Sequence, residues 1–460
     1  MMQLAEAAVA LGARNSGADA LFTGVSTDSR SIKEGELFVA LRGERFDGHD
    51  FLKVVAAAKA AAAMVDSKFR GEYPVPALVV DDTRRSLGDL ARYWRARFAP
   101  ALVAITGSNG KTTVKEMLAA IFRKHASETA VLATRGNLNN DIGLPLTLLG
   151  LRHAHRWCAI ELGMNHKGEI AYLAGITRPT VALVNNAQRE HLEFMRSVED
   201  VAAENASVYD ALGEDGVAVI NADDPHAAFF HSRAGKRRTV DFGLGLGGGA
   251  VTGRYRLERL SSEIRLDTPA GAADATLAIP GLHNVRNALA AAACAFAVGI
   301  EVKTIAHGLS AFRPYTGRLQ VKKAASGATV IDDSYNANPD SVRAAIDVLA
   351  SCPAPTALVL GDMGEVGEHG AEFHREVGAY ARAQGVSQLL ALGEATRHAV
   401  EAFGEGARHF ATVEDLLSEI EANTVLVKGS RFMRMERIVS ALTGPAESAP
   451  ASGRSAEGGH

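Results

Sequence analysis

The chain has 460 residues, and at roughly 100–200 residues per domain this length predicts about two to four domains. Hydrophobic residues make up 47% of the chain, enough for several cores, while the net charge of only −4 excludes a large basic surface for nucleic acid. The sequence contains no run of about 18 apolar residues, so we expect no membrane span.

The first segment, residues 1–83, mixes short strands and helices. Apolar runs predict strands at 37–41 and 77–80, and an Ala-rich stretch predicts a helix over 51–63. The start of the chain lacks the basic and apolar parts of a secretory signal, so a cytoplasmic location is expected. In a reducing cytosol, the widely spaced Cys158, Cys294 and Cys352 are expected to be buried free thiols.

The second segment, residues 84–313, alternates apolar runs with helical stretches. Runs begin at Ala101 and cover 157–161, 181–185 and 217–220. This alternation predicts a parallel sheet with helices on both faces. Ligands of such sheets bind beyond the carboxyl ends of the strands, where Gly107, Glu161 and Asn185 fall.

One turn in this segment predicts a site for a nucleoside triphosphate. An apolar strand leads into a Gly-rich turn, and a helix follows. The glycines let backbone N–H groups face a phosphate, and the helix adds its positive N-terminal end. Lys111 can reach the outer phosphates, and Thr112 can hold Mg²⁺. The alternative is an ordinary turn with a surface lysine, since Ile105 stands where the usual pattern has Gly. The candidate nucleotide-binding residues are Thr106, Gly107, Ser108, Asn109, Gly110, Lys111, Thr112 and Thr113.

The third segment, residues 314–443, predicts a second open α/β unit. Its strand-like runs lie at 329–332, 357–360, 388–392 and 424–428, with helical stretches between them. The tail, 444–460, has almost no large apolar residue, and this composition predicts disorder. The Gly-rich stretch 243–249 leads into no clear helix, so it is interpreted as a flexible loop.

Two further side chains fit metal-assisted phosphate chemistry. Glu161 ends a predicted strand, and His191 lies just after another. A carboxylate and an imidazole suit a divalent ion that bridges a transferred phosphate. Each also has a simpler explanation, because strand-end carboxylates are usually solvated and most histidines bind no metal.

Several motifs stand in a fixed order along the chain. They are Gly-Ser-Asn-Gly-Lys-Thr-Thr at 107–113, Asn-Leu-Asn-Asn-Asp-Ile-Gly-Leu-Pro at 137–145, Glu-Leu-Gly-Met-Asn at 161–165, His-Leu-Glu at 191–193 and Gly-Leu-His-Asn-Val-Arg-Asn at 281–287. Together they resemble the Mur ligases, a family of ATP-dependent amide-forming enzymes of peptidoglycan precursor synthesis. The motifs at 332–339, 360–363 and 427–431 are similar to the members that add D-alanyl-D-alanine. The resemblance runs from about residue 20 to about residue 440.

The resemblance implies three α/β domains. These are an N-terminal UDP-binding domain (1–83), a central P-loop-type parallel-sheet ATPase domain (84–313) and a C-terminal Rossmann-like domain (314–443). It implies that ATP phosphorylates the terminal carboxylate of UDP-N-acetylmuramoyl-tripeptide, and that the amine of D-alanyl-D-alanine then displaces the phosphate. We expect ATP and Mg²⁺ as cofactors, a monomer, and closure of the third domain about a hinge at 313–317 when nucleotide binds.

The resemblance also assigns residue roles around ATP. Lys111, His191 and Arg318 would be catalytic, and Thr112, Glu161 and His191 would hold the metal. Asn284 and Asn287 would meet the adenine, although helix capping explains Asn284 equally well. Arg318 and Asp333 would reach ATP from the third domain, although both could be interdomain ion pairs.

The remaining implied roles concern the other substrates. Ser29 and Arg30 would face the uridine diphosphate. Tyr335, Asn336 and Asn338 would lie near D-alanyl-D-alanine, although an Asn-Ala-Asn-Pro run is also a good turn.

One position departs from the family pattern. Many Mur ligases have a lysine fourteen positions after the histidine, carbamylated so that its new carboxylate binds a second Mg²⁺; here that position is Asn205. Asparagine cannot be carbamylated, and its amide oxygen is a weaker ligand for a hard cation. We hypothesise that no carbamate forms and that Asn205 or Glu204 takes this role directly or through water.

Two kinds of alternative function stay open. The first is another ligase of the superfamily, either the diaminopimelate- or lysine-adding enzyme or folylpolyglutamate synthase, although the Asp-Asn-Pro-Arg motif of the diaminopimelate-adding enzyme is absent. The second is a nucleotide-gated scaffold without an amide product. The joint presence of the metal-binding, adenine and third-domain candidates argues against a scaffold.

Overall fold

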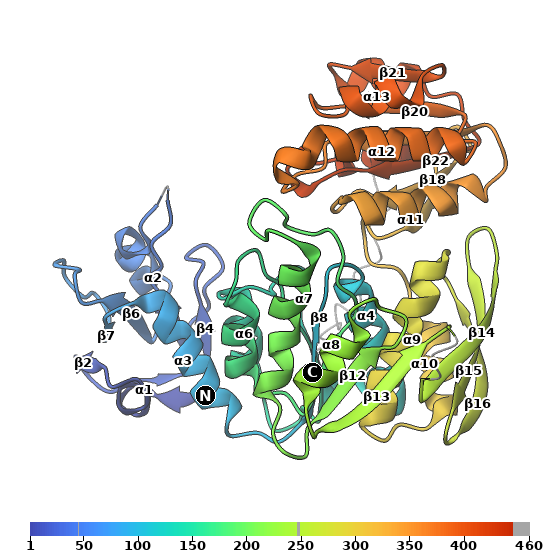
Figure 1. The fold of residues 1–460 in the computed structure, drawn as a ribbon. Helices are drawn as coiled ribbons and strands as arrows, with labels where there is room; N and C mark the ends of the chain where they lie inside the picture. Colours follow the sequence, from blue (N-terminus) through green and yellow to red (C-terminus); the bar gives the residue numbers. More distant parts are fainter. Residues whose placement is uncertain (45, 246–248, 445–460) are drawn as a thin grey trace, which may run out of the picture.

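The computed structural model describes residues 1–44, 46–245 and 249–444. Figure 1 shows the N-terminal part in blue beside a central body in green and yellow, with the C-terminal part in orange and red beyond it. The large sheets of these parts draw their strands from separate stretches of chain. The α/β class predicted from the sequence is confirmed.

The N-terminal part contains a five-stranded sheet in the order β2-β7-β6-β5-β4 and a two-stranded sheet, β1-β3. The strands are β1 (Met2–Gln3), β2 (Arg14–Ser16), β3 (Leu21–Phe22), β4 (Gly24–Ser26), β5 (Glu36–Val39), β6 (Ala62–Asp66) and β7 (Ala77–Val80). The helices are α1 (Leu4–Leu11), η1 (Gly48–Phe51), α2 (Leu52–Ala57) and α3 (Thr83–Arg95).

The helix predicted over 51–63 is wrong in its second half. Helix α2 ends at Ala57, and the buried strand β6 occupies Ala62–Asp66 between two parallel neighbours. A strand that is buried on both faces carries no alternation of polar residues, so its Ala-rich run is indistinguishable from a buried helix by periodicity.

The central body is built on a nine-stranded sheet in the order β16-β15-β14-β13-β12-β11-β8-β10-β9. Its strands are β8 (Ala101–Thr106), β9 (Val131–Ala133), β10 (Trp157–Glu161), β11 (Val181–Val184), β12 (Val217–Asn221), β13 (Arg238–Gly243), β14 (Val251–Leu257), β15 (Ser262–Thr268) and β16 (Gly271–Leu277). Its helices are α4 (Lys111–His125), η2 (Glu128–Ala130), α5 (Gly143–Leu149), α6 (Glu169–Thr177), α7 (Val198–Ala206), η3 (Ser207–Ala211), α8 (Ala227–Ala234), α9 (Leu282–Ala297) and α10 (Val302–Ala311).

Alternate residues of β8 enter two different cores. Val103 and Ile105 pack in the core that contains α4, α9 and α10, whereas Leu102 and Ala104 pack in the core that contains α3, α5 and α6. Helices therefore cover both faces of the sheet, as the sequence predicts. Because helices bury both faces of the sheet from solvent, the parallel strands are apolar throughout.

The central sheet is parallel, as predicted, except at one edge. Strand β14 pairs antiparallel with β15, which pairs antiparallel with β16. Antiparallel strands can be joined by short turns, so no crossover helix separates these three strands. Within the Gly-rich stretch 243–249, Gly243 ends β13, and residues 246–248 lie outside the described residues.

The C-terminal part is a six-stranded sheet in the order β17-β18-β22-β19-β20-β21. All pairings are parallel except that between β17 and β18. The strands are β17 (Gln320–Lys323), β18 (Thr329–Asp333), β19 (Thr356–Gly361), β20 (Gln388–Leu392), β21 (Ala407–Phe410) and β22 (Thr424–Lys428). The helices are α11 (Pro339–Ala350), η4 (Gly367–His369), α12 (Gly370–Ala383), α13 (Arg397–Phe403), α14 (Val413–Ser418), η5 (Arg431–Met433) and α15 (Glu436–Thr443).

Three other expectations concern the whole chain. Of the helices in the described ranges, none has the length and apolar character needed to cross a lipid bilayer. Cys158, Cys294 and Cys352 are free and buried, as expected. The disorder predicted for the tail falls almost entirely on 445–460, which lie outside the described residues.

Candidate active site

A cleft of about 1500 Å³ lies at the carboxyl ends of the central strands. It is lined by the phosphate turn, by the ends of β10 and β11, by the start of α9 and by residues of the C-terminal part. Fifteen of the predicted site residues line this one cleft. They are Ser108, Asn109, Gly110, Lys111, Thr112, Thr113, Glu161, His191, Asn284, Asn287, Arg318, Asp333, Tyr335, Asn336 and Asn338.

The turn between β8 and α4 has no room for side chains at its glycines. Gly107 has φ 127° and Gly110 has φ 84°, which is left-handed backbone that favours glycine. A Cβ at Gly107 would lie 2.9 Å from the amide nitrogen of Asn186, and one at Gly110 would lie 2.2 Å from Oδ1 of Asn287. The turn is therefore packed tightly against neighbouring backbone and side chains, and its shape depends on both glycines.

Lys111 is held inside the turn by three acceptors. Its Nζ donates to the carbonyl oxygens of Gly107 at 2.6 Å and Ser108 at 3.1 Å, and it lies 2.9 Å from Oε1 of Glu190. Glu190 is 9% exposed. The ammonium group thus sits at the place where the outer phosphates of a nucleotide are expected, and a carboxylate neutralises it there.

Glu161 presents one satisfied and one free oxygen. Its Oε1 accepts a hydrogen bond from Nδ2 of Asn139 at 2.7 Å, while its buried Oε2 has no partner among the described residues. A buried carboxylate oxygen without a donor is costly unless a cation or donor binds it. Glu161 therefore fits the predicted role of metal ligand.

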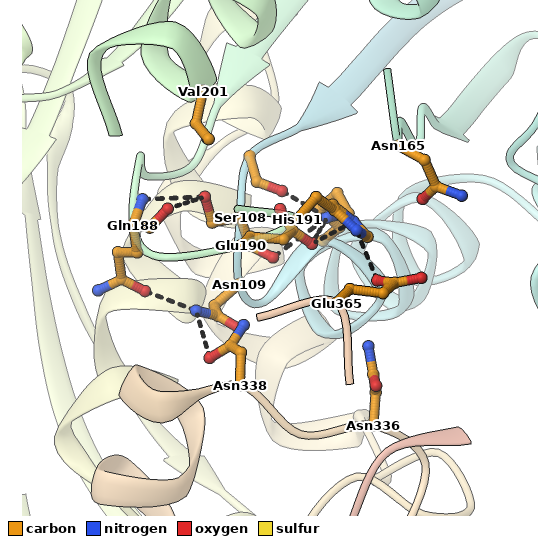
Figure 2. Close-up of polar contacts among 12 residues, drawn as sticks. Ser108, Asn109, Asn165, Gln188, Glu190, His191, Val201, Asn336, Asn338 and Glu365 are labelled. Atoms are coloured by element: carbon orange, nitrogen blue, oxygen red, sulfur yellow. Dashed lines mark hydrogen bonds and ion pairs between the residues drawn. The ribbon is translucent and has the colours of Figure 1, made fainter. Parts of the chain in front are cut away.

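His191 lies between two carboxylates, one from each side of the cleft. Its Nδ1 is 2.6 Å from Oε2 of Glu365, in the C-terminal part, and its Nε2 is 3.3 Å from Oε1 of Glu190. Figure 2 shows Glu365 reaching His191 from the segment after β19. Although burial by itself lowers the pKa of His191, the neighbouring carboxylates of Glu190 and Glu365 raise it to about 9.

The metal candidates do not form a closed cage. Across the ranges 1–44, 46–245 and 249–444, no group of three or more His, Cys, Asp and Glu side chains is arranged to hold a metal ion. Mg²⁺ does not need such a cage, because it keeps several waters and uses one or two carboxylates plus substrate phosphates. Thr112, Glu161 and His191 all line the cleft and fit such an open site.

Asn284 and Asn287 form a chain of amides on one face of α9. Nδ2 of Asn287 donates to Oδ1 of Asn284 at 3.1 Å, and Nδ2 of Asn185 donates to Oδ1 of Asn287 at 3.0 Å. The alternative interpretation of Asn284 as a helix cap is wrong. Gly281 is the N-cap of α9, and Asn284 lies inside the first turn, where its Nδ2 donates to the carbonyl of Pro280.

The C-terminal part contributes a buried ion pair that the sequence did not reveal. Nζ of Lys428 lies 2.5 Å from Oδ2 of Asp333, across the neighbouring strands β22 and β18. Asp333 is therefore paired within its own sheet and not across domains. Burial lowers the pKa of Lys428. Arg318 stacks on Tyr335, with its guanidinium carbon 4.2 Å from the ring centroid.

Asn338 connects the C-terminal part to the phosphate turn. It is the N-cap of α11, where its side chain accepts a hydrogen bond from the backbone N–H of Ser341, so the Asn-Ala-Asn-Pro run leads into a helix and is not itself a turn. Its Nδ2 also donates to Oδ1 of Asn109 at 2.9 Å (Figure 2). Glu190 and Glu365 lie in loops without a recognisable spacing, so no sequence pattern indicated them.

Comparisons with known proteins agree with this geometry. Family models match for the Mur ligase middle domain over residues 105–295, for the Mur ligase glutamate ligase domain over 317–431 and for the Mur ligase family catalytic domain over 21–95. The chain belongs to the Mur ligase family. Mur ligases are ATP-dependent.

Three relatives of this Mur ligase cover nearly its whole length. UDP-N-acetylmuramoyl-tripeptide–D-alanyl-D-alanine ligase from Escherichia coli strain K12 is 41% identical over 93% of this chain and 95% of its own. The crystal structure of MurF from Acinetobacter baumannii is 33% identical, with a TM-score of 0.88 over 95% of this chain and 98% of its own. MurF ligase from Thermotoga maritima in complex with ADP is 26% identical, with a TM-score of 0.79 over 91% and 97%.

Four predicted residues of this Mur ligase are not among those that line the cleft. Thr106 is the last residue of β8, and Gly107 is the first residue of the turn that follows. Ser29 and Arg30 lie in the turn after β4, where the 87% exposed side chain of Arg30 pairs with Asp28. The structure leaves these two residues apart from the described cleft.

The hypothesis that Asn205 or Glu204 holds the metal does not fit the geometry. Oδ1 of Asn205 accepts a hydrogen bond from Oγ1 of Thr106 at 2.6 Å. The two carboxylate oxygens of Glu204 accept the N–H groups of Gly168 and Ile170 at the start of α6. These oxygens are used in structural hydrogen bonds, and neither residue is among the described lining of the cleft.

Proposed function

We propose that this Mur ligase uses ATP to join D-alanyl-D-alanine to UDP-N-acetylmuramoyl-tripeptide, giving the pentapeptide precursor of peptidoglycan. The observation that carries the proposal is the cleft, in which the phosphate turn, the strand-end groups and the C-terminal sheet meet. The relative that is 41% identical over most of both chains carries this activity in its name.

The reaction needs activation of a carboxylate. A carboxylate resists attack by an amine because oxide would have to leave. An oxygen of the tripeptide carboxylate therefore attacks the γ-phosphorus of ATP, the bond to the bridging oxygen breaks, and ADP leaves. The amine nitrogen of D-alanyl-D-alanine then attacks the acyl carbon, the amine loses a proton, and phosphate leaves with the electron pair of the broken C–O bond. Several negative charges must be held close together throughout.

The residues of the phosphate turn would neutralise and orient the nucleotide. Lys111 would leave its carbonyl and carboxylate partners and bind the outer phosphates, while the N–H groups at the start of α4 would face them. Asn284 and Asn287 offer donors and acceptors to the adenine, and Arg318 and Asp333 would reach the nucleotide from the C-terminal part.

A magnesium ion would be held by residues that are already beside the turn. Thr112, Glu161 and His191 are the candidates, and the free Oε2 of Glu161 supports this role. When bound, Mg²⁺ supplies positive charge that offsets the charge of the transferred phosphate. The two nitrogens of His191 face opposite carboxylates, so its ring orientation is set before any ligand binds.

The remaining assignments follow the same division of the chain. We propose that residues 1–83 bind the UDP part through Ser29 and Arg30, that 84–313 bind ATP, and that 314–443 bind D-alanyl-D-alanine beside Tyr335, Asn336 and Asn338. We further propose a monomer that acts in the cytoplasm, where nucleotide-linked precursors and ATP are present. Size-exclusion chromatography coupled to light scattering tests the oligomeric state, and the mass of a monomer is expected.

Mass spectrometry of the reaction products tests the function. Purified protein is incubated with ATP, Mg²⁺, the UDP-linked tripeptide and D-alanyl-D-alanine, and the expected product is the UDP-linked pentapeptide. Phosphate release is measured in parallel with diaminopimelate, lysine or glutamate as the amine donor. Release with one of these donors but not with D-alanyl-D-alanine would assign the chain to another ligase of the superfamily.

A further inference from the structure

Glu190 is a buried carboxylate beside the cleft, and its second oxygen has no hydrogen-bond partner among the described residues. It lies in the loop between β11 and α7, is 9% exposed and lines the cleft. Its Oε1 is shared between Nζ of Lys111 at 2.9 Å and Nε2 of His191 at 3.3 Å. Its Oε2 is buried and has no hydrogen-bond partner in the described chain. Figure 2 shows Glu190 beside His191 and the phosphate turn.

A buried carboxylate is stable only while a cation compensates it. In this structure, Lys111 supplies that charge. The proposed function requires the ammonium of Lys111 to turn toward the phosphates of ATP. That movement would remove the main partner of Glu190 and would bring further negative charge close to it. A second cation must then take over from Lys111.

We propose that Glu190 is a ligand, with His191, for the divalent cation that accompanies the nucleotide. This inference rests on the proposed function and assigns Glu190 to the same site. The 3.3 Å between Oε1 of Glu190 and Nε2 of His191 is close to the spacing of adjacent ligands around an octahedral ion. With metal–ligand bonds of about 2.1 Å, that spacing is about 3.0 Å.

The surroundings of His191 favour the same arrangement. Nδ1 of His191 is directed to Glu365, so Nε2 is the nitrogen that remains for a metal, and it is the nitrogen that faces Glu190. The neutral Asn205 adds no negative charge to the site, and its oxygen is used by Thr106. Glu190 would therefore supply the anionic oxygen that a hard cation prefers.

If Glu190 had a purely structural role, its carboxylate would be hydrogen-bonded differently. A carboxylate that serves only to hold Lys111 would be expected to use both oxygens in the buried loop, as Glu204 does at the start of α6. Glu190 instead leaves its buried Oε2 without a hydrogen bond, although the residue lines the cleft. A buried carboxylate oxygen of this kind is stabilised when a cation or a donor binds it.

The test is a binding titration on the full chain with Mn²⁺ as the probe. Free Mn²⁺ is measured by electron paramagnetic resonance in the presence of a non-hydrolysable ATP analogue, for wild type, Glu190→Gln and Glu190→Asp. Glu214→Gln, on the exposed loop before β12, is the matched control. Glu190→Gln keeps the size of the side chain and removes its charge, and circular dichroism checks that each variant folds.

We expect Glu190→Gln to weaken Mn²⁺ binding by about tenfold or more, Glu190→Asp to weaken it less, and Glu214→Gln to leave it unchanged. With EDTA in place of Mn²⁺, the analogue should bind Glu190→Gln at least as tightly as wild type, because a repulsive charge is gone. If folded Glu190→Gln binds Mn²⁺ as tightly as wild type does, the proposal is overturned. An equal loss of analogue affinity in EDTA would also overturn it, since Glu190 would then act only through Lys111.

Two further outcomes keep this test separate from the proposed function. If Glu190→Gln does not fold, Glu190→Asp decides alone, and unchanged Mn²⁺ affinity in that variant contradicts the proposal. If wild type forms no pentapeptide product, the proposed function fails. If it forms the product while Glu190→Gln keeps full Mn²⁺ affinity, only the role of Glu190 fails.

Discussion

Arg189 and Asp340 join the two sides of the cleft. Nη2 of Arg189, in the loop after β11, donates to Oδ1 of Asp340, in the first turn of α11, at 2.6 Å. Arg189 also binds Glu376 of α12 at 2.6 Å. Because the same loop carries Glu190 and His191, these ion pairs hold the C-terminal part against the proposed metal site.

Replacing Arg189 should open the cleft. Arg189→Met removes the charge-assisted hydrogen bonds to Asp340 and Glu376, which together stabilise the observed arrangement of the two sides by about 2 kcal/mol, roughly 30-fold relative to a more open one. The radius of gyration from solution scattering of ligand-free protein should increase. Arg343→Met is the control, because Arg343 binds Glu376 within the C-terminal part alone. An unchanged radius in Arg189→Met would contradict the prediction.

The shape of the phosphate turn should depend on Gly110 for steric reasons. Gly110→Ala places a Cβ 2.2 Å from Oδ1 of Asn287 at a left-handed φ, so the turn must deform and nucleotide binding should be lost. Gly385→Ala has the same backbone strain, about 1–2 kcal/mol, but no atom of the described chain lies within 4 Å of its Cβ. Calorimetric titration with ATP should therefore separate the two variants. Equal ATP affinity in both would rule out the steric argument.

Lys111 should be required for ATP binding, and its removal should also lower stability because buried Glu190 loses its cation. Lys111→Met removes charge-assisted hydrogen bonds to phosphate, each worth about 1.5–3 kcal/mol, so ATP affinity should fall by about tenfold or more. The exposed Lys124, at the other end of α4, gives the matched variant Lys124→Met. Full ATP affinity in Lys111→Met, measured by calorimetry with Mg²⁺ and the UDP-linked tripeptide present, would refute the assignment of the phosphate turn.

Acid should destabilise the protein through His283. Burial and the nearby charge of Lys428 lower the pKa of His283 to about 4, compared with about 6.5 in an unfolded chain. Between these values the unfolded state binds a proton that the folded state does not, so the free energy of unfolding falls as the pH falls. The full contribution is present above about pH 6.5, and on the order of 3 kcal/mol is lost by about pH 4.

Urea unfolding of wild type and His283→Gln checks this effect. At about pH 7.5 and about pH 4.5, wild type should lose more stability than His283→Gln. His307→Gln, on the exposed surface of α10, should keep the wild-type pH dependence. Identical pH dependence in wild type and His283→Gln would show that His283 does not titrate as proposed.

Asn205 should keep this enzyme independent of carbamylation. Its amide is bound to Thr106 and to the carbonyl of Val201, and it offers no amine for reaction with carbon dioxide. The intact mass of native protein should therefore be the same with and without bicarbonate. A bicarbonate-dependent carbamate on a lysine that lines the cleft, such as Lys167, would contradict this expectation.

The α/β class and membership of the Mur ligase family could be read from the sequence alone. The turn from Gly107 to Thr113 is a local feature, because its glycines, lysine and hydroxyl residues act within one strand–turn–helix unit. Apolar runs likewise located most of the buried strands. Periodicity failed where burial removes it, as in β6, and it could not distinguish parallel pairing from the antiparallel edge made by β14, β15 and β16.

The tertiary structure alone decided which charges face one another. Glu190 meets Lys111 across 79 residues of chain, Asp333 meets Lys428 across 95, and Arg189 meets Asp340 across 151. The partners lie in loops, at strand ends or in the first turn of a helix, and the pairing follows from sheet order and domain packing. Buried charge has to be compensated by whatever group the fold brings near it, and for that reason local sequence patterns do not reveal these contacts.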